Sequence, residues 1–113
     1  MGIENYSEDI LVATLPKEPE LRRELTIVNE IVSNKGGRDV IIDFTRVDTL
    51  TSSSISNLLV LRDLLHESGH RLVLCNVASP TEDIFRVAGL SEVFDCVDDK
   101  SAALESVELA RKK

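Results

Sequence analysis

The chain has 113 residues, of which 42% are hydrophobic and 29% are charged, and these values are typical of one globular domain. Its formal net charge of -7 would repel a nucleic-acid backbone, and its one basic cluster is the short tail at residues 111–113. No apolar run approaches the ~20 residues of a membrane span, and the first residues lack the pattern of a secretory leader. We therefore expect a cytoplasmic protein that neither binds nucleic acid nor inserts directly into a membrane.

The first half of the chain predicts two strands and two helices. Residues 10–15 form an apolar run that ends at Pro16, because proline donates no hydrogen bond to a sheet. Apolar residues then recur at helical spacing between residues 20 and 35 and share one face, namely Leu21, Leu25, Val28 and Val32. Residues 40–44 form a short run that is apolar apart from Asp43, which indicates a central strand covered on both faces. A strongly apolar helical pattern follows from about residue 53 to residue 68.

The second half repeats the same alternation. Residues 71–76 read as a buried strand, and Ser79 is predicted to cap a short helix with Pro80 in its first position. Residues 93–97 read as the last strand. A helix that begins near residue 101 follows it.

Short apolar strands that alternate with amphipathic helices are typical of the α/β class, in which right-handed crossovers join parallel strands. We predict one domain over residues 8–110, with a mixed, mostly parallel sheet of about four strands and helices packed against it. Residues 1–7 are expected to form a flexible N-terminus, and residues 111–113 a basic tail.

Motifs of the common enzyme classes are absent from the sequence, which contains no GxGxxG, GxxxxGK[ST], HExxH or GxSxG pattern. His66 and His70 are expected to be exposed at a helix end. Cys75 and Cys96 lie in apolar runs without a basic neighbour, so we expect buried free thiols rather than a redox pair. We predict no catalytic residue, no cofactor and no metal ion.

Four successive hydroxyl residues, Thr51 to Ser54, lie where the central strand has ended and the second helix begins. The free N–H groups and the positive dipole end of a first helical turn suit a phosphate. The simpler interpretation is that these residues only cap the helix, which is worth ~1 kcal/mol. Residue pattern alone favours the cap, because Ser and Thr are common at such turns.

Residues 43–55, from Asp43 to Ile55, resemble the signature D-[LF]-[ST]-x-V-x-x-[ILM]-D-S-[ST]-G-[LI] of STAS domains of the anti-sigma-factor antagonist family. A second segment, residues 71–94, is similar to that family's third conserved block, a strand, a loop and a helix that ends in Gly-Leu. The likeness extends from Ile10 to Leu104 and implies the STAS fold.

The resemblance also implies a function. In that family the first serine of the signature is phosphorylated by a partner that is both an anti-sigma factor and an ATP-dependent serine kinase, and a phosphatase resets it. Ser52 occupies this position. Thr51 stands where the family has aspartate and Ser54 where it has glycine, so Ser53, Thr51 and Ser54 are alternative acceptors.

We therefore predict a non-enzymatic module that docks on an anti-sigma factor/serine kinase and is switched off by phosphorylation of Ser52. The resemblance implies no particular oligomeric state. The predicted docking residues lie between 43 and 57 and around 76–81, and they are Asp43, Thr45, Thr51, Ser52, Ser53, Ser54, Asn57, Asn76 and Ser79. The alternative is a STAS adaptor or scaffold subunit, in a stressosome-like complex or an ABC-type lipid transporter. A small enzyme or a nucleotide-binding protein ranks last, because neither a base nor a phosphate-binding loop is evident.

Overall fold

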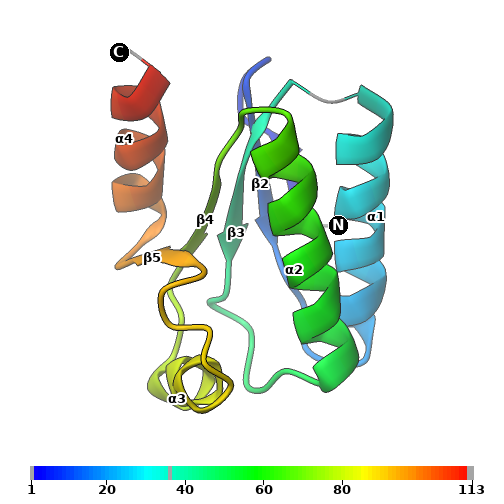
Figure 1. Ribbon diagram of the computed structural model, residues 1–113, viewed down its shortest axis with the longest axis vertical. Coiled ribbons are helices and arrows are strands. Elements are labelled where there is room, and N and C mark those ends of the chain that lie inside the picture. The colour runs from blue at the N-terminus through cyan, green and yellow to red at the C-terminus, as the bar shows by residue number, and fades with distance from the viewer. Residues whose placement is uncertain (1, 36, 112–113) are drawn as a thin grey trace.

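The computed structural model describes residues 2–35 and 37–111, which form five strands and four helices (Figure 1). In chain order these elements are β1 (Ile3–Asn5), β2 (Ile10–Thr14), α1 (Glu20–Lys35), β3 (Asp39–Asp43), α2 (Ser52–Glu67), β4 (Leu72–Cys75), α3 (Ser79–Val87), β5 (Asp95–Val97) and α4 (Lys100–Arg111). No helix within the described residues is long and apolar enough to cross a membrane.

The strands form one mixed sheet in the order β1-β2-β3-β4-β5. Strands β2 to β5 run parallel to one another, and Leu11 lies opposite Val40 and Ile41 opposite Val73 in the register. The predicted α/β class, the mostly parallel sheet and the central place of β3 are confirmed.

The sheet contains one more strand than the predicted four or so. This strand, β1, pairs antiparallel with β2 and places Ile3 opposite Ala13. Its three residues include two polar ones, so they carry no recognisable strand pattern, and the pairing itself fixes them. The sheet therefore begins within the segment that we predicted to be a flexible N-terminus. Residues 112 and 113 of the predicted basic tail lie outside the described residues.

Helices cover both faces of the sheet. In Figure 1, α1 and α2 lie side by side on one face, α4 lies on the other, and α3 crosses the lower end. The larger core joins α1 and α2 to one face of the strands and includes Leu25, Leu58, Leu61 and Ile42. The smaller core joins Val107 of α4 to the opposite face. Burial of a Leu or Ile side chain contributes about 1.5–3 kcal/mol, so the apolar stripes of the helices determine these two layers.

Two predicted details near the later strands are wrong. The last strand begins at Asp95 rather than at residue 93, because the Val93 N–H donates to the Leu90 carbonyl in a turn. The N-cap of α3 is Ala78, which makes no side-chain cap, and Ser79 is the first residue of the helix.

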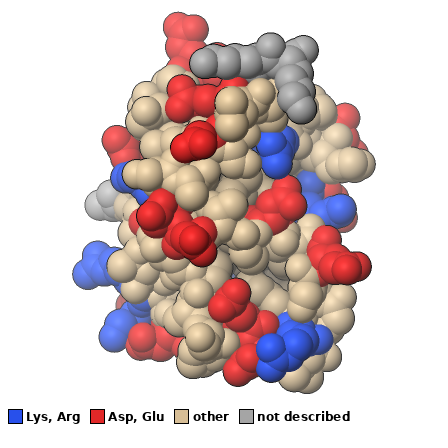
Figure 2. Space-filling view, turned by 90° about the vertical axis from the view of Figure 1, so that its left-hand side faces the viewer, with Lys and Arg blue, Asp and Glu red and all other residues tan. Residues whose placement is uncertain are grey.

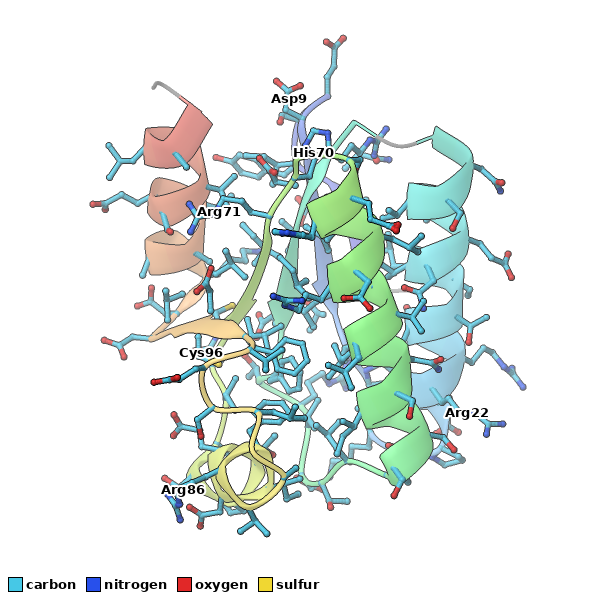
Figure 3. All side chains as sticks on the ribbon, viewed as in Figure 1. Asp9, Arg22, His70, Arg71, Arg86 and Cys96 are labelled. Atoms are coloured by element: carbon cyan, nitrogen blue, oxygen red, sulfur yellow. The ribbon has the colours of Figure 1, made fainter. Side chains whose placement is uncertain are left out.

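Two predicted burial states also need correction. Cys75 is buried as expected, but Cys96 is exposed, because it lies on β5, the edge strand of the sheet. His66 is exposed, whereas the His70 side chain is only 19% exposed and its Nδ1 lies 3.4 Å from Oδ1 of Asp39. His70 and the neighbouring Arg71 lie at the upper end of the sheet in Figure 3.

Parallel strands place their carboxyl ends at one edge, and loops at that edge carry the functional residues of many α/β proteins. Strands β2, β3 and β4 end at the lower edge in Figure 1, where α1, α2 and α3 begin. The hydroxyl cluster of residues 51–54 therefore lies at this edge.

Candidate partner-docking site

The loop between β3 and α2 is held by buried apolar residues at intervals. Phe44, Val47 and Leu50 are buried, at 1%, 4% and 8% exposure, while Thr45 and the residues between these anchors face solvent. The ring of Phe44 packs edge-on against Phe85 of α3, with ring centroids 6.5 Å apart. The loop consequently presents polar side chains from a fixed backbone.

Asp43 joins this loop to the next one. Its Oδ1 accepts hydrogen bonds from the Thr45 N–H at 2.9 Å, the Thr45 hydroxyl at 2.5 Å and the Asn76 amide at 3.1 Å. Asn76 has a φ of 56°, in the left-handed region that asparagine tolerates better than most residues. Its own N–H donates to the Asp98 carbonyl at 3.2 Å. The carboxylate thus fixes the positions of the β3–α2 and β4–α3 loops relative to each other.

The hydrogen bonds to Asp43 also favour its charged form. Burial raises the pKa of this carboxyl, but the bonds from Thr45 and Asn76, with the positive charge of Lys100, outweigh that effect. The pKa of Asp43 therefore lies below its ordinary value of 3.8. At neutral pH the carboxylate is an ionised acceptor that holds the loops.

The hydroxyl cluster divides into capping and exposed residues. Thr51 is the N-cap of α2, and its Oγ1 accepts from the Ser54 N–H at 3.2 Å. Ser54 is fully buried, so it is part of the cap. Ser52 and Ser53 are exposed in the first turn of the helix. Thr51 and Ser54 thus form the predicted cap, while Ser52 and Ser53 remain exposed outside it.

Glu18 is a site residue that the sequence analysis missed. It lies between β2 and α1, and its Oε2 accepts from the Thr51 N–H at 3.0 Å and from the Ser54 hydroxyl at 2.7 Å. The first turn of α2 contains no acidic residue of its own, although an acid there would be stabilised by the helix dipole. This lack is the one local signal that an acid from elsewhere in the chain could lie beside the turn. Nothing in the sequence indicates which of its acids fills that place.

The other predicted docking residues lie around this centre. Asn57 is partly buried, and its carbonyl accepts from the Asn29 side chain of α1 at 3.4 Å. Asn76 is partly buried beneath the loop, and Ser79 is exposed at the start of α3. Asp43 is 9% exposed, so we assign it a positioning role beneath the surface rather than a direct contact.

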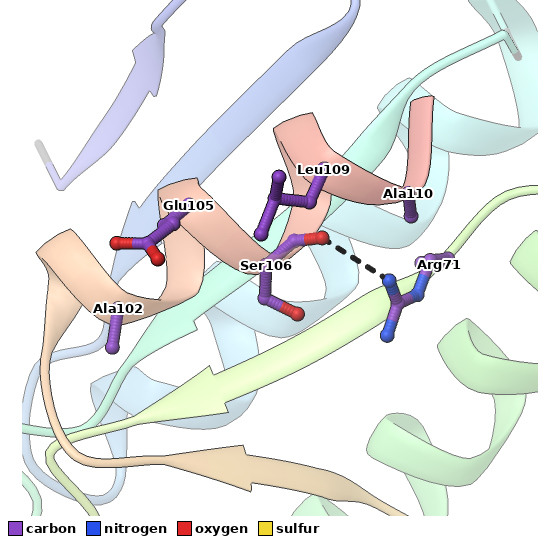
Figure 4. A pocket seen from close by; sticks show the side chains of 6 residues that line it. All are labelled: Arg71, Ala102, Glu105, Ser106, Leu109 and Ala110. Carbon is purple, nitrogen blue, oxygen red and sulfur yellow. Dashed lines mark hydrogen bonds between the residues drawn. The ribbon is translucent and has the colours of Figure 1, made fainter. Parts of the chain in front are cut away.

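A separate hollow lies away from this site. It has a volume of about 460 Å³ and lies between α4 and Arg71, whose guanidinium donates to the Ser106 carbonyl at 3.3 Å (Figure 4). Figure 2, a view of the side that α4 and β5 occupy, shows acidic side chains spread over the surface. This hollow is on the opposite face of the sheet from α2 and contributes nothing to the hydroxyl site.

The described residues include neither a cysteine with a lowered pKa nor a cluster of metal-ligating side chains. Burial raises the pKa of the Cys75 thiol to about 12, and the negative charge of Asp43 adds to the effect. Although the Cys96 residue is exposed, partial desolvation of its thiol and the negative charges of Glu82 and Asp95 raise the pKa of Cys96. No group of three or more His, Cys, Asp or Glu side chains in residues 2–35 and 37–111 is arranged to hold a metal ion.

Comparison with known proteins connects this geometry to a family. The STAS domain family model matches residues 16–103. The chain belongs to the STAS domain family. The predicted family is thereby confirmed, and the match includes both the hydroxyl cluster and the loop that carries Glu18.

One curated relative has a name that classes it with the anti-sigma factor antagonists. This protein, BtrV of Bordetella bronchiseptica, is 26% identical to the STAS chain over 77 residues. Those residues are 68% of this chain and 66% of BtrV, so the match spans just under two thirds of the relative.

Solved structures share the fold over nearly the whole STAS chain. An RsbS variant from Moorella thermoacetica has a TM-score of 0.80 at 14% identity, covering 98% of this chain and 97% of its own. The anti-sigma factor antagonist SpoIIAA has a TM-score of 0.79 at 16% identity when unphosphorylated, with 94% of each chain covered. Phosphorylated SpoIIAA from Bacillus has a TM-score of 0.71 at 17% identity, covering 93% of this chain and 96% of its own. A chain from the stressosome has a TM-score of 0.76 at 16% identity, covering 98% of this chain and 99% of its own.

Proposed function

We propose that this STAS domain is a cytoplasmic, non-enzymatic anti-sigma-factor antagonist that docks on an anti-sigma factor/serine kinase and is switched off by phosphorylation of Ser52. In the unphosphorylated state it sequesters the kinase and so frees a sigma factor. A phosphatase returns the phosphorylated form to the active state. The observation that carries the proposal is the exposed Ser52 hydroxyl in the first turn of α2, at the position of the family's phosphoacceptor.

The hydrogen bonds around α2 support Ser52 as the acceptor. The Ser54 N–H is bonded to the Thr51 hydroxyl, and the Thr51 N–H to Glu18. The described hydrogen bonds leave the N–H groups of Ser52 and Ser53 to solvent, where a phosphate on Ser52 could accept from them.

The four hydroxyl residues differ as phosphoacceptors. Ser53 is exposed beside Ser52 and is the next candidate. Thr51 is exposed as a residue, but its Oγ1 serves the cap. Ser54 has no exposed surface, and its hydroxyl donates to Glu18, so a kinase would have to unfold the first turn of α2 to reach it. We therefore remove Ser54 from the proposed acceptors and docking contacts.

Phosphorylation would change the charge of the docking surface without breaking the fold. A phosphate adds roughly -1.5 to -2 charge at neutral pH. The positive end of the α2 dipole lies beside it, so the modified domain should remain folded while the surface repels an acidic partner. The docking surface comprises exposed Thr45, the start of α2 and the start of α3 with Ser79.

The test is a pull-down from source-cell lysate, with and without ATP, using wild type, Ser52→Ala and Ser52→Asp as baits. We expect wild type and Ser52→Ala to capture a kinase-like ATPase and Ser52→Asp to lose it. Intact-mass analysis should then find one phosphate on wild type and none on Ser52→Ala. Ser56→Asp is the matched control, because Ser56 is also exposed on α2 but one turn further along the helix.

The second candidate is a scaffold or adaptor role, in a stressosome-like assembly or beside an ABC-type lipid transporter. It is favoured by the structural likeness to a stressosome chain and by Thr51 and Ser54 in place of the family's aspartate and glycine. Capture of the same scaffold or membrane proteins by all three baits, without phosphate on any, would replace the first proposal with this one.

A further inference from the structure

The cap of α2 is completed by a residue from another part of the chain. In a capping box, the side chain of the third helical residue accepts a hydrogen bond from the N-cap N–H. Ser54 occupies that third position, and its short side chain donates to Glu18 instead. The Thr51 N–H is bonded to the same Glu18 oxygen, at 3.0 Å. Glu18 therefore performs the acceptor role of the capping box from 33 residues away.

Glu18 also supplies the negative charge that the start of α2 lacks. The first turn of α2 has no acidic residue, and the position before Ser52 holds Thr51 where the family signature has aspartate. An anion at the N-terminus of a helix is stabilised by the dipole and by the unbonded N–H groups. The Glu18 carboxylate receives this stabilisation while Ser52 is unmodified.

We propose that Glu18 is the positioning residue of the Ser52 switch, whose carboxylate holds the start of α2 in the unmodified protein and is displaced when Ser52 carries a phosphate. This inference rests on the proposed function, because it concerns the regulation of the same site. A phosphate on Ser52 that accepts from the free N–H groups of Ser52 and Ser53 would lie in the same helical turn as the Glu18 carboxylate, which accepts from the Thr51 N–H, and the two anions would repel each other.

Displacement of Glu18 would be transmitted to the docking surface through the turn that precedes α1. Next to Glu18, the Lys17 ammonium lies 3.1 Å from the Asp48 carboxylate of the β3–α2 loop. The Leu15 N–H donates to the Asp43 carbonyl at 3.0 Å, at the start of the same loop. The segment over residues 15–19 is thus bonded to the loop that presents Thr45 and to the helix that presents Ser52. Release of its Glu18 contact alters the shape of that surface as well as its charge.

A double-mutant cycle tests the contact without any partner. Wild type, Ser52→Asp, Glu18→Gln and the double variant are unfolded in urea, and their unfolding equilibrium constants are compared. We expect Ser52→Asp to destabilise the wild type, because two carboxylates then share one helix start. In the Glu18→Gln background the same aspartate is the only acid there and should stabilise the helix. The two effects should differ about threefold or more in the equilibrium constant and should have opposite signs.

Glu20→Gln is the matched control for Glu18→Gln, because Glu20 is an exposed acid two residues away, in the first turn of α1. Its cycle with Ser52→Asp should be additive. A Glu18 cycle that is additive as well would overturn the inference.

Phosphoserine introduced at residue 52 gives a direct readout by amide NMR. The Thr51 amide and the amides of residues 17 and 18 should shift on phosphorylation in the wild type. In Glu18→Gln, the Thr51 amide should already be displaced and residues 17 and 18 should respond little. Unchanged Lys17 and Glu18 amides in the phosphorylated wild type would overturn the displacement.

These outcomes separate the inference from the proposed function. Additive cycles with a phosphate still found on Ser52 in lysate would reject the role of Glu18 and leave the switch intact. Non-additive cycles with no phosphate on Ser52 in the pull-down would reject the switch, and with it the regulatory use of the Glu18 contact.

Discussion

Asp39 and Asp43 are the first and last residues of β3, and both are almost completely buried, at 3% and 9% exposure. At the amino end, Oδ1 of Asp39 accepts from the Arg71 N–H at 2.8 Å and lies 3.4 Å from Nδ1 of His70. At the carboxyl end, Oδ1 of Asp43 accepts from Thr45 and Asn76. Both carboxylates thus bind groups of neighbouring segments at the sheet edge.

The two ends of β3 differ in the helix ends that surround them. The Asp39 end has α2 finishing beside it, with its carbonyl groups and negative dipole end, whereas the Asp43 end has the starts of α1, α2 and α3. The free N–H groups of these helix starts, with the exposed hydroxyls of Ser52 and Ser53, therefore lie at the carboxyl end. A buried aspartate thus marks a structural junction at each end of β3, and the helix starts at the Asp43 end make that junction the one with N–H groups available to an anion.

The largest effect should come from Asp43→Ala. It removes the charged acceptor of three hydrogen bonds and leaves the Thr45 and Asn76 donors unpaired, at a cost of about 3 kcal/mol in the free energy of unfolding. Urea unfolding measures this loss, and kinase capture should fall too, because two docking loops lose their connection. Asp39→Ala is the control: it should be destabilising while kinase capture by the folded fraction stays at the wild-type level. Equal loss of capture in both variants would contradict the division between the two ends.

The acid response should also distinguish Asp43. Its pKa is lower in the folded state than the ordinary 3.8, so its charge contributes stability above that pH. This contribution is lost as the pH falls below about 3.8 toward the folded pKa. In Asp43→Asn the decline of the unfolding free energy over this acid range should be shallower than in wild type, as urea unfolding at stepped pH would measure. An unchanged slope would mean that other carboxyls dominate acid unfolding.

A smaller effect is expected at the two ends of α2. Thr51→Ala removes the side-chain cap of the helix start and should cost about 1 kcal/mol. Ser68→Ala, at the other end, removes hydroxyl bonds to the carbonyls of Leu64 and Leu65 and should cost under about 0.5 kcal/mol, because those carbonyls are already helical acceptors or reach water. Thermal or urea unfolding of both variants measures the two losses of stability. A larger loss in Ser68→Ala than in Thr51→Ala would contradict this prediction.

The smallest change in stability should come from Ser52→Ala. Ser52 is exposed and no hydrogen bond of its side chain is found among the described residues, so the unfolding free energy should stay within about 0.5 kcal/mol of wild type. The same variant should carry no phosphate after the pull-down with ATP, as intact-mass analysis would show. A marked loss of stability would mean that Ser52 is part of the cap. The pull-down with Ser52→Ala would then need Thr51→Ala beside it, as a variant that is destabilised at the same cap.

Local patterns predicted most of the fold. Helical spacing identified α1 and α2, and the continuous apolar run identified β3 as central, because buried positions follow the period of the element that contains them. The pattern did not predict β1, whose three residues are fixed by pairing with β2 rather than by any periodicity. Nor did it predict that Phe94 would turn into the core beside Phe85 instead of extending β5, with ring centroids 5.3 Å apart.

For the candidate site, too, the sequence predicted some features and the tertiary structure decided others. The sequence by itself determined the alternation of elements, the family signature and the place of the hydroxyl cluster at a helix start, since each of these is written in neighbouring residues. Only the tertiary structure decided that Ser54 is buried while Ser52 is exposed, that Asp43 bonds Asn76, and that Glu18 caps α2. Those contacts join residues 33 or more positions apart, and they depend on how loops at one edge of the sheet pack, which no local period encodes.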